Sequence, residues 1–371
     1  MKAGLEDVIA GESSICFIDG DAGILAYRGY NIHELAGKST FEETSHLLWF
    51  GTLPRADELA RTTRQMTENR AIPGAALDLM RSFPKTALPM EALRTTISAL
   101  SMFDPESEDM TPEANQRKAI RLTAQCASVV AAFDRIRKGL APLEPRADLS
   151  HAGNFYYMLT GKMPNETIVR ALDIALVLHA DHEWNASTFA GRVTAATLSD
   201  IYSASVSAIG ALKGPLHGGA NEAVMRMLLE IGDVSGVDDY VRRIFAEKRK
   251  IPGFGHRVYH TEDPRATHLR RMSEEACARE GQPQWFEMST RIERLVKAEK
   301  RLNPNVDFYS ASVYYVIGMA IDLFTPFFAV SRMSGWTAHI LEQYSNNRLI
   351  RPRADYIGPP PDLKWKPIEQ R

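Results

Sequence analysis

The chain has 371 residues, of which 44% are hydrophobic and 24% are charged, and its formal net charge at pH 7 is −2. This length and composition are typical of a soluble globular protein of about two domains. The near-neutral charge gives no reason to expect binding to nucleic acid or to a membrane.

The cysteines and the N-terminus indicate the compartment. Cys16, Cys126 and Cys277 lie far apart and form no CxxC pair, which argues against a disulfide framework or a zinc cluster. Free thiols are the usual state in a reducing cytoplasm, and the first residues lack the apolar core of a signal peptide. We therefore expect a cytoplasmic protein.

The first predicted element is a β-hairpin within residues 15–30. β-Branched and aromatic residues there flank Asp19-Gly20-Asp21-Ala22-Gly23, which is typical of a turn between two strands. Helical patterns then take over. Residues 39–42 have the spacing of a capping box and predict the start of a helix. The following amphipathic segments predict helices over residues 56–70, 74–83, 89–103 and 111–139.

The second half of the chain is also predicted to be helical. The expected ranges are 148–160, 165–183, 186–212, 221–232, 237–250, 263–281, 283–302, 310–324 and 326–344. Residues 346–371 contain five prolines and show no periodicity, which predicts an extended arm.

These elements make the fold class all-α, with a short N-terminal β-hairpin. The helices between residues 221 and 302 are more charged than the apolar segments before and after them, which predicts a small domain inserted into a large one. We expect residues 1–219 and 315–371 to form the large domain, with the C-terminal arm in its second part. Residues 220–314 are expected to form the small domain.

A histidine stands at a predicted break between two helices. His217 lies in the sequence GPLHGGANE, between a Gly-Pro turn and a Gly-Gly pair. The free N–H groups of a helix start favour negative charge, so an imidazole there suits an anion or a developing oxyanion. The structural alternative is a glycine-rich helix connection with an incidental histidine.

Two more histidines occur in the sequence HADHE. His179 and His182 are three residues apart, which would place them on one face of a helix. A metal pair is one interpretation, but the sequence lacks the HExxH pattern of zinc proteases. With the following segment Asn185-Ala186-Ser187-Thr188, the histidines indicate a site for a small polar ligand.

A basic segment precedes a glycine-rich loop and a further histidine in KRKIPGFGHR, residues 248–257. Its single GxG lacks the third glycine and the preceding strand of a dinucleotide-binding motif. The loop can still present backbone N–H groups to a base or phosphate, while a solvated helix end is the structural alternative. The turn that follows carries Arg265, whose guanidinium matches a carboxylate.

Three charged residues complete the candidates. Asp307 comes directly before an apolar helix, where a helix cap is the structural alternative. Arg332 lies inside an apolar helix, so its charge must be paired or face a cavity. Arg351 lies on the extended arm, where taken alone it would be an ordinary surface residue.

Taken together, these segments resemble citrate synthase. GPLHGGANE, IPGFGHRVY with DPR, NVDFYS and AVSRMSGWTAHILEQ occur in the order and at the spacing of that family, and the resemblance runs from the hairpin to IRPRADYIGP. It implies a two-domain helical homodimer that condenses acetyl-CoA with oxaloacetate to give citrate and CoA, with no metal and no cofactor.

The resemblance also implies a role for each candidate residue. The catalytic residues would be His217, His256 and Asp307. The oxaloacetate ligands would be His182, Arg265, Arg332 and Arg351, the last acting across the dimer in the partner's active site. The CoA site would comprise Lys250, Pro252, Gly253, Phe254, Gly255 and Arg257, with the turn at residues 213–218. His260 departs from the lysine that many bacterial members carry, which puts a CoA phosphate contact there in doubt.

The chemistry of these residue types fits the reaction. A carboxylate in a desolvated cleft is basic enough to deprotonate a weak carbon acid, which suits Asp307. His217 would donate a hydrogen bond to the thioester oxygen from a neutral ring, because a helix dipole disfavours the imidazolium. His256 would polarise and protonate the oxaloacetate carbonyl. The alternatives are a 2-methylcitrate synthase that uses propionyl-CoA, a non-catalytic CoA-binding helical protein, and a metal-binding protein.

Overall fold

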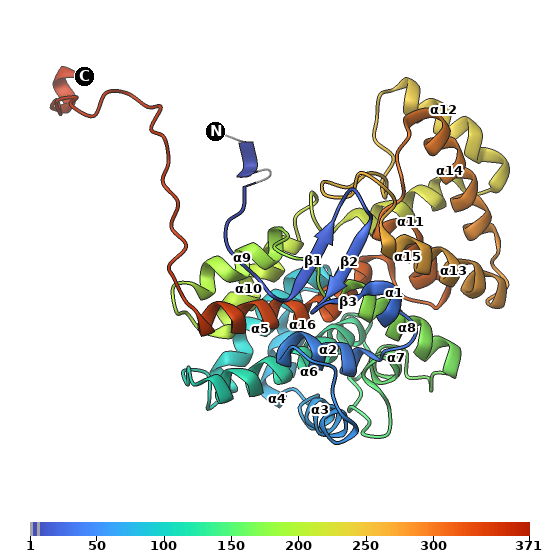
Figure 1. Ribbon diagram of the computed structural model, residues 1–371, viewed down its shortest axis with the longest axis horizontal. Coiled ribbons are helices and arrows are strands. Elements are labelled where there is room, and N and C mark those ends of the chain that lie inside the picture. The colour runs from blue at the N-terminus through green and yellow to red at the C-terminus, as the bar shows by residue number, and fades with distance from the viewer. Residues whose placement is uncertain (1–2, 6–7) are drawn as a thin grey trace.

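The structure is a computed structural model that describes residues 3–5 and 8–371, and within them it has sixteen α-helices and one small sheet (Figure 1). Strands β1 (Cys16–Asp19), β2 (Ile24–Tyr27) and β3 (Tyr30–Asn31) pair antiparallel in this order. The predicted hairpin and the helical fold class are therefore confirmed.

Most of the helices pack around two long central ones, α6 (Pro112–Arg137) and α16 (Phe324–Ser345). Both are buried over most of their length, because small and apolar side chains cover more than one face. The surrounding helices are α1 (Ile32–Leu35), α2 (Phe41–Phe50), α3 (Ala56–Glu68), α4 (Gly74–Ser82), α5 (Pro89–Leu100), α7 (His151–Thr160), α8 (Glu166–His179), α9 (Ala186–Ala195) and α10 (Ile201–Leu212).

A second group of helices lies to one side of this body, at the right of Figure 1. Its members pack mainly on one another, and α11 and α13 also touch helices of the larger group. They are α11 (Ala220–Ile231), α12 (Val237–Ala246), α13 (Pro264–Arg279), α14 (Gln284–Lys300) and α15 (Val306–Val316).

Several predicted helix boundaries were wrong. The single helix expected over residues 186–212 is two helices, because Leu198 adopts a left-handed φ of 62° and Asp200 then caps α10 by accepting the N–H of Ser203. The helix expected over residues 165–183 ends at His179. The capping residue of α2 is Thr40, whose hydroxyl accepts the N–H of Glu43.

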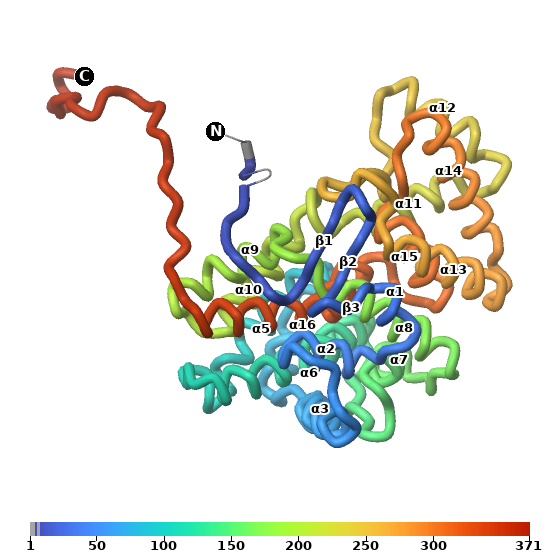
Figure 2. Tube along the Cα trace, in the orientation of Figure 1, coloured from blue at the N-terminus to red at the C-terminus, as the bar shows by residue number. Residues whose placement is uncertain are grey.

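The C-terminal segment, residues 346–371, forms the extended arm that its prolines predict, and it runs away from the helical body (Figure 2). Large apolar side chains on it are exposed, with 94% of Ile357 and 78% of Trp365 accessible to solvent. Among the described residues, no helix is both long and apolar enough to cross a membrane.

Candidate active site

His217 lies in the turn between α10 and α11 and is held by the start of α9. The backbone N–H of Ser187 lies 3.3 Å from Nε2 of His217, and the Ser187 hydroxyl lies 2.8 Å from the same atom. A backbone N–H can only donate, so Nε2 is unprotonated and the proton of the neutral ring is on Nδ1. Burial, and then the Arg332 guanidinium, lowers the pKa of His217 to about 4. Burial, and not the helix dipole suggested by the sequence, is therefore the main reason that the ring of His217 is neutral.

His256 lies in the loop between α12 and α13 and is fixed by its own loop. Its Nδ1 atom accepts the backbone N–H groups of Val258, at 3.0 Å, and of Tyr259, at 3.2 Å. The proton of the neutral ring is therefore on Nε2, the opposite tautomer to His217. Burial, and then the neighbouring Arg265, lowers the pKa of His256 to about 4.

His182 packs beside His256. Its Nε2 atom is 3.2 Å from the Tyr259 hydroxyl, and the two histidine rings lie 5.2 Å apart between centroids. Burial, and then the positive charge of Arg265, holds the pKa of His182 well below its usual range.

The predicted helical pairing of His179 with His182 was wrong, because α8 ends at His179. The His179 ring turns back on its own helix, with Nδ1 2.8 Å from the carbonyl of Ala175. Across the described part of the chain, no group of three or more His, Cys, Asp or Glu side chains is arranged to hold a metal ion.

Asp307 is the second residue of α15 and does not cap it. Asn305 caps the helix, and its Oδ1 atom accepts the N–H of Asp307. The Asp307 carboxyl group therefore does not cap the helix and can contact a ligand. Burial raises its pKa to about 7, although the Arg265 guanidinium opposes the shift.

The segment that leads to Asp307 lies against the predicted CoA loop. Gly255 donates its N–H to the carbonyl of Asn303 at 3.0 Å, and Asn305 donates its N–H to the carbonyl of Gly253 at 2.9 Å. The Phe254 and Phe308 rings meet edge to face. The loop around His256 and the helix start around Asp307 therefore form one unit.

Arg265 is buried with a carboxylate partner. Its Nε and Nη2 atoms lie 2.9 and 2.7 Å from the two carboxylate oxygens of Asp263, and only 2% of the residue is exposed. This bidentate pair fixes the guanidinium in place. The pair leaves Nη1 as the one guanidinium nitrogen with no protein partner among the residues described here.

Arg332 is buried without such a partner. It is 1% exposed, its Nε atom donates to the carbonyl of His179 at 2.6 Å, and its guanidinium lies over the ring of Phe328. No carboxylate of the described residues lies within ion-pairing distance of it. Burial accordingly lowers the pKa of Arg332 to about 10. A buried, unpaired cation is unfavourable unless an anionic ligand joins it.

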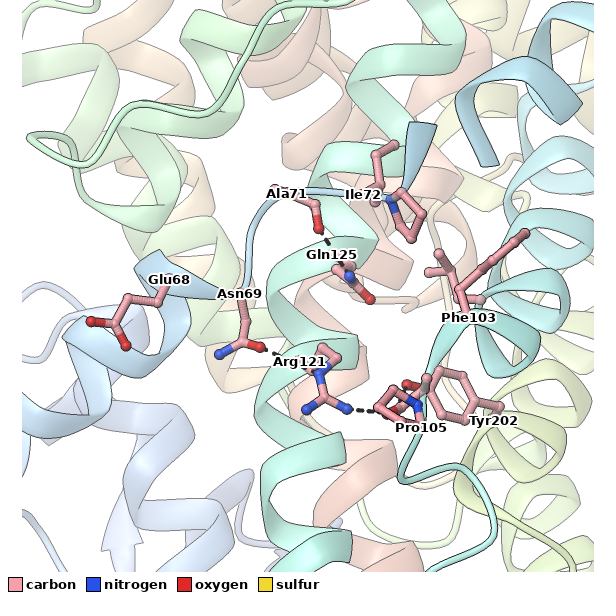
Figure 3. A pocket seen from close by; sticks show the side chains of 12 residues that line it. Glu68, Asn69, Ala71, Ile72, Phe103, Pro105, Arg121, Gln125 and Tyr202 are labelled. Atoms are coloured by element: carbon pink, nitrogen blue, oxygen red, sulfur yellow. Dashed lines mark hydrogen bonds and ion pairs between the residues drawn. The ribbon is translucent and has the colours of Figure 1, made fainter. Parts of the chain in front are cut away.

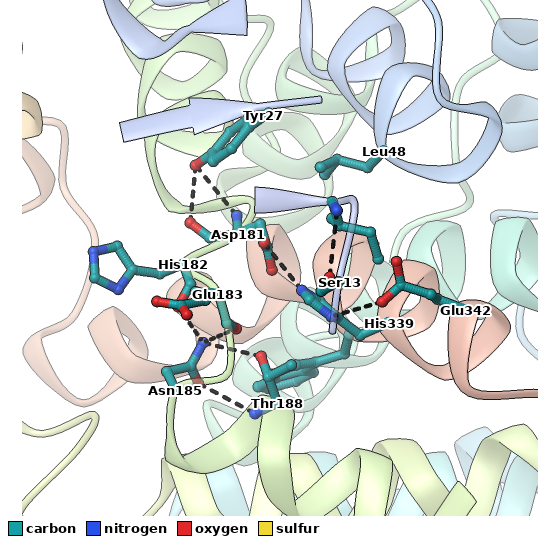
Figure 4. Close-up of polar contacts among 12 residues, drawn as sticks. Ser13, Tyr27, Leu48, Asp181, His182, Glu183, Asn185, Thr188, His339 and Glu342 are labelled. Atoms are coloured by element: carbon teal, nitrogen blue, oxygen red, sulfur yellow. Dashed lines mark hydrogen bonds and ion pairs between the residues drawn. The ribbon is translucent and has the colours of Figure 1, made fainter. Parts of the chain in front are cut away.

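A set of supporting residues was missed by the sequence reasoning (Figure 4). Tyr27 donates its hydroxyl to the carbonyl of Asp181 at 3.0 Å, and the Asp181 carboxylate lies 3.1 Å from Nε2 of His339. Both contacts fix the segment that ends in His182. Gly335 of α16 permits this packing, because a Cβ atom there would lie 2.2 Å from the carbonyl of Ala180.

The remaining candidates lie outside this cluster. Arg351 is exposed on the arm, and Lys250 and Arg257 are exposed on the loop before α13. A separate hollow of about 360 Å³ lies between α3, α5, α6 and α10 (Figure 3). It contains none of the predicted site residues, and its polar side chains bond one another, as Arg121 does with Asp104.

Comparisons with known proteins agree over the whole chain. Residues 4–353 match the family model described as citrate synthase, C-terminal domain. The chain is 56% identical to citrate synthase 2 of Bacillus subtilis (strain 168) over 369 residues, covering 99% of this chain and 98% of that protein. It is 50% identical to the citrate synthase of Haloferax volcanii, covering 100% and 99%.

A solved structure shares the fold. The citrate synthase of Thermoplasma acidophilum, in a ternary complex with carboxymethyl coenzyme A and oxaloacetate, superposes with a TM-score of 0.93. It is 33% identical in sequence, and the match covers 99% of this chain and 98% of that one.

Proposed function

The chain belongs to the citrate synthase family and acts as a citrate synthase, and we propose that His217, His256 and Asp307 carry out its chemistry. The reaction condenses acetyl-CoA with oxaloacetate and then hydrolyses citryl-CoA to citrate and CoA. The observation that carries the site assignment is that the buried guanidinium groups of Arg265 and Arg332 act on the pKa of all three residues: Arg332 on His217, Arg265 on His256, and both on the Asp307 carboxyl group, whose pKa is about 7.

Oxaloacetate would be bound by the buried cations. Arg332 lacks an anionic partner and Arg265 keeps Nη1 free of protein contacts, so together they offer donors to a dicarboxylate. His182 and His256, with rings 5.2 Å apart, would hold the carbonyl oxygen between the two carboxylate contacts. The oxaloacetate present in the Thermoplasma acidophilum complex supports this assignment.

Deprotonation of acetyl-CoA would be the first chemical step. The Asp307 carboxylate takes a proton from the methyl group, and burial gives it the basicity to do so. The electron pair moves onto the thioester oxygen, where the Nδ1–H of His217 donates a hydrogen bond and stabilises the enolate. The neutral imidazole of His217 is a sufficient donor here, because its hydrogen bond stabilises the negative charge that develops on the thioester oxygen.

Condensation would follow at the oxaloacetate carbonyl. The enolate carbon attacks the carbonyl carbon, the C=O bond opens, and its oxygen takes the proton from Nε2 of His256, which then regains a proton from solvent. Water then cleaves the thioester of citryl-CoA and releases the CoA thiol and citrate. Each positioned acid or base in such a sequence is worth roughly 10²–10⁴-fold in rate. We propose that the reaction needs neither a metal nor a cofactor.

We propose that residues 220–314 form the small domain and that it closes over the large domain when oxaloacetate binds. The packing of α11 to α15 mainly on one another supports this division. His256, Arg265 and Asp307 lie in that segment, whereas His182 and Arg332 lie outside it. A dicarboxylate held from both sides would draw the two parts together and exclude water.

We propose a cytoplasmic homodimer in which Arg351 reaches the partner's oxaloacetate site. Arg351 is exposed on an arm that runs away from its own body. The arm also exposes large apolar side chains, such as Ile357 and Trp365. Exposed apolar patches of this kind are typical of surfaces that bind another protein chain. The loop from Lys250 to Arg257 would hold CoA through its backbone N–H groups.

The deciding experiment measures CoA release by the purified protein with oxaloacetate, comparing kcat/KM for acetyl-CoA and propionyl-CoA. A strong acetyl preference is expected and would place the enzyme at the entry of carbon into the tricarboxylic acid cycle. A propionyl preference would make it a 2-methylcitrate synthase. The additional methylene group changes the interaction free energy in the pocket that holds the acyl group by about 1–3 kcal/mol. No CoA release with either substrate would contradict the roles of His217, His256 and Asp307.

A further inference from the structure

The tip of the N-terminal hairpin touches the loop that carries His256 (Figure 1). Gly20 accepts the backbone N–H of His260 at 3.0 Å. The Asp21 carboxylate lies 2.7 Å from Nδ1 of His260. Two turns that are some 240 residues apart in sequence are therefore joined by a backbone bond and a side-chain bond.

The approach of the two turns is close enough to exclude any side chain at Gly20. A Cβ atom built there would lie 1.9 Å from the carbonyl oxygen of Val258. The backbone of Gly20 does not have the left-handed φ that favours glycine, so the hairpin itself would accept an alanine. Glycine is therefore required at residue 20 because the loop that contains Val258 lies against it, and not because of the conformation of the hairpin turn.

Two residues of the same loop determine the tautomer of His256. The backbone N–H groups of Val258 and Tyr259 are the ones that donate to its Nδ1 atom. Val258 faces Gly20, and the next residue after Tyr259 is His260, which is bonded to the hairpin. A shift of the hairpin would therefore move the donors that keep the His256 proton on Nε2.

The base of the hairpin is anchored on the other side of the site. The Tyr27 hydroxyl donates to the carbonyl of Asp181, the residue before His182. The helix that follows the hairpin, α1, makes a further link, because Nδ1 of His33 lies 2.8 Å from Nε2 of His268 on α13. The hairpin thus spans from the segment of His182 to the segment of His256.

We propose that the hairpin turn, residues 19–23, is a positioning element for the reaction: Gly20, Asp21 and their partner His260 hold the loop 256–260 so that His256 presents its Nε2–H to the substrate carbonyl. Gly20, Asp21 and His260 are positioning residues, because they act through His256. The proposal rests on the proposed function, since His256 is assigned as the acid there.

The main test is Gly20→Ala compared with Gly74→Ala. Gly74 begins α4, has no atom within 4 Å of a built Cβ, and has no left-handed φ, so it controls for the added methyl group. We expect kcat at saturating substrates to fall roughly tenfold to a hundredfold in Gly20→Ala, the usual effect of an ångström-scale misplacement. Gly74→Ala is expected to keep the wild-type kcat.

Hydrogen exchange supplies a readout that does not depend on activity. The amides of Val258 and Tyr259 should exchange faster in Gly20→Ala, because their bonds to His256 are broken. A kcat within twofold of the control, or unchanged exchange at these amides, would overturn the proposal. If the wild-type protein releases no CoA, the proposed function fails, whereas the exchange measurement still tests the hairpin contact.

The exposed contact between Asp21 and His260 gives a second test with a smaller expected effect, which can be used if Gly20→Ala does not fold. Asp21→Ala should lower kcat by about two- to fivefold, the lower part of the range expected for the loss of one hydrogen bond. Asp21→Asn keeps an oxygen acceptor for the His260 ring and should restore most of that loss. Equal kcat values for Asp21→Ala, Asp21→Asn and the wild type would overturn the role of the pair.

Discussion

The backbone N–H of Ser187 lies 3.3 Å from Nε2 of His217, and this one contact decides which nitrogen of the histidine can act on a substrate. His217 is left with its proton on Nδ1, whereas His256, whose Nδ1 accepts two N–H groups, keeps its proton on Nε2. The fold therefore offers two neutral imidazole donors, each with a defined direction.

Replacing Ser187 should weaken the first of these donors without removing it. The Ser187 hydroxyl lies 2.8 Å from Nε2 of His217 and 2.7 Å from Oδ1 of Asn185, and it accepts the indole N–H of Trp336. In Ser187→Ala the backbone bond remains, so we expect kcat to fall by about three- to tenfold, the worth of one hydrogen bond. Ser205→Ala is the matched control, since among the described residues that buried hydroxyl bonds only the carbonyl of Ile201. Equal kcat values in the two variants would contradict the positioning role of Ser187.

The raised pKa of Asp307 predicts both the pH dependence of turnover and that of stability. Burial raises this pKa to about 7, so the free enzyme should gain kcat/KM as the pH rises through about 7, where the base becomes ionised. Because the folded pKa exceeds the unfolded one, the stability that Asp307 contributes is present at low pH and lost as the pH rises toward 8. Asp307→Asn should therefore abolish turnover while raising the Tm above wild type at pH 8, with a smaller difference at pH 5.

Asp173 provides the control for this prediction. Burial also raises its pKa to about 7, and its carboxylate accepts the N–H of Phe41, away from the candidate site. Asp173→Asn should show the same direction of pH-dependent stability change and retain turnover. A kcat/KM profile of the wild type that is flat between pH 6 and pH 8 would contradict Asp307 as the base, because about 7 is the pKa that burial gives it.

Arg332 and Arg192 are both buried, but replacing each with methionine should have different effects on the Tm. Arg332→Met removes a buried charge that has no carboxylate partner, so the Tm without ligand should stay constant or rise. Arg192 is also buried but pairs with Glu342 at 2.7 Å, so Arg192→Met should lower the Tm by leaving that carboxylate unpaired.

Adding oxaloacetate separates the two roles further. Saturation at a hundred times Kd stabilises a protein by about 2.7 kcal/mol, which thermal unfolding detects readily. The wild type and Arg192→Met should both show this rise in Tm, and Arg332→Met should not. A full oxaloacetate-dependent rise in Arg332→Met would show that the buried guanidinium does not bind the substrate.

The sequence predicted the elements whose pattern is local. The hairpin at residues 16–27 and the long helix α6 follow from turn residues and from apolar periodicity over many turns. The break at Leu198 was missed, because the surrounding Ala- and Ser-rich segment has no glycine or proline there and its periodicity continues through it. His182 was misplaced for a related reason, since nothing in HADHE marks the end of α8.

The candidate site was recognisable where glycine and proline mark the turns that carry it, as they do at His217 and His256. Ser187 was not recognisable in this role, because a serine after the capping Asn185 is an ordinary helix start. Its contact with His217 depends on how α9 meets a turn 30 residues later. Local patterns carry no information on such a distance, and only the packed structure supplies it.

Arg351 poses the question of whether one chain is sufficient for the site. It lies on the exposed arm, outside the cluster that contains Arg332, so we expect it to act in the partner subunit. Arg351→Ala should raise the KM for oxaloacetate and leave the Tm of the protein unchanged, because the side chain is exposed and has no ion pair among the described residues.

Mixed dimers of Arg351→Ala and Asp307→Ala test the direction of this contact. If Arg351 acts across the interface, each mixed dimer has one site with both defects and one intact site, so mixing the two preparations under subunit exchange should restore turnover at low oxaloacetate, where each variant alone turns over slowly. If Arg351 acts within its own chain, every site in the mixed dimer keeps one defect and turnover stays low. Wild type mixed with Asp307→Ala gives the reference for the extent of exchange, and a mixture that regains no activity against that reference would refute the arrangement in trans.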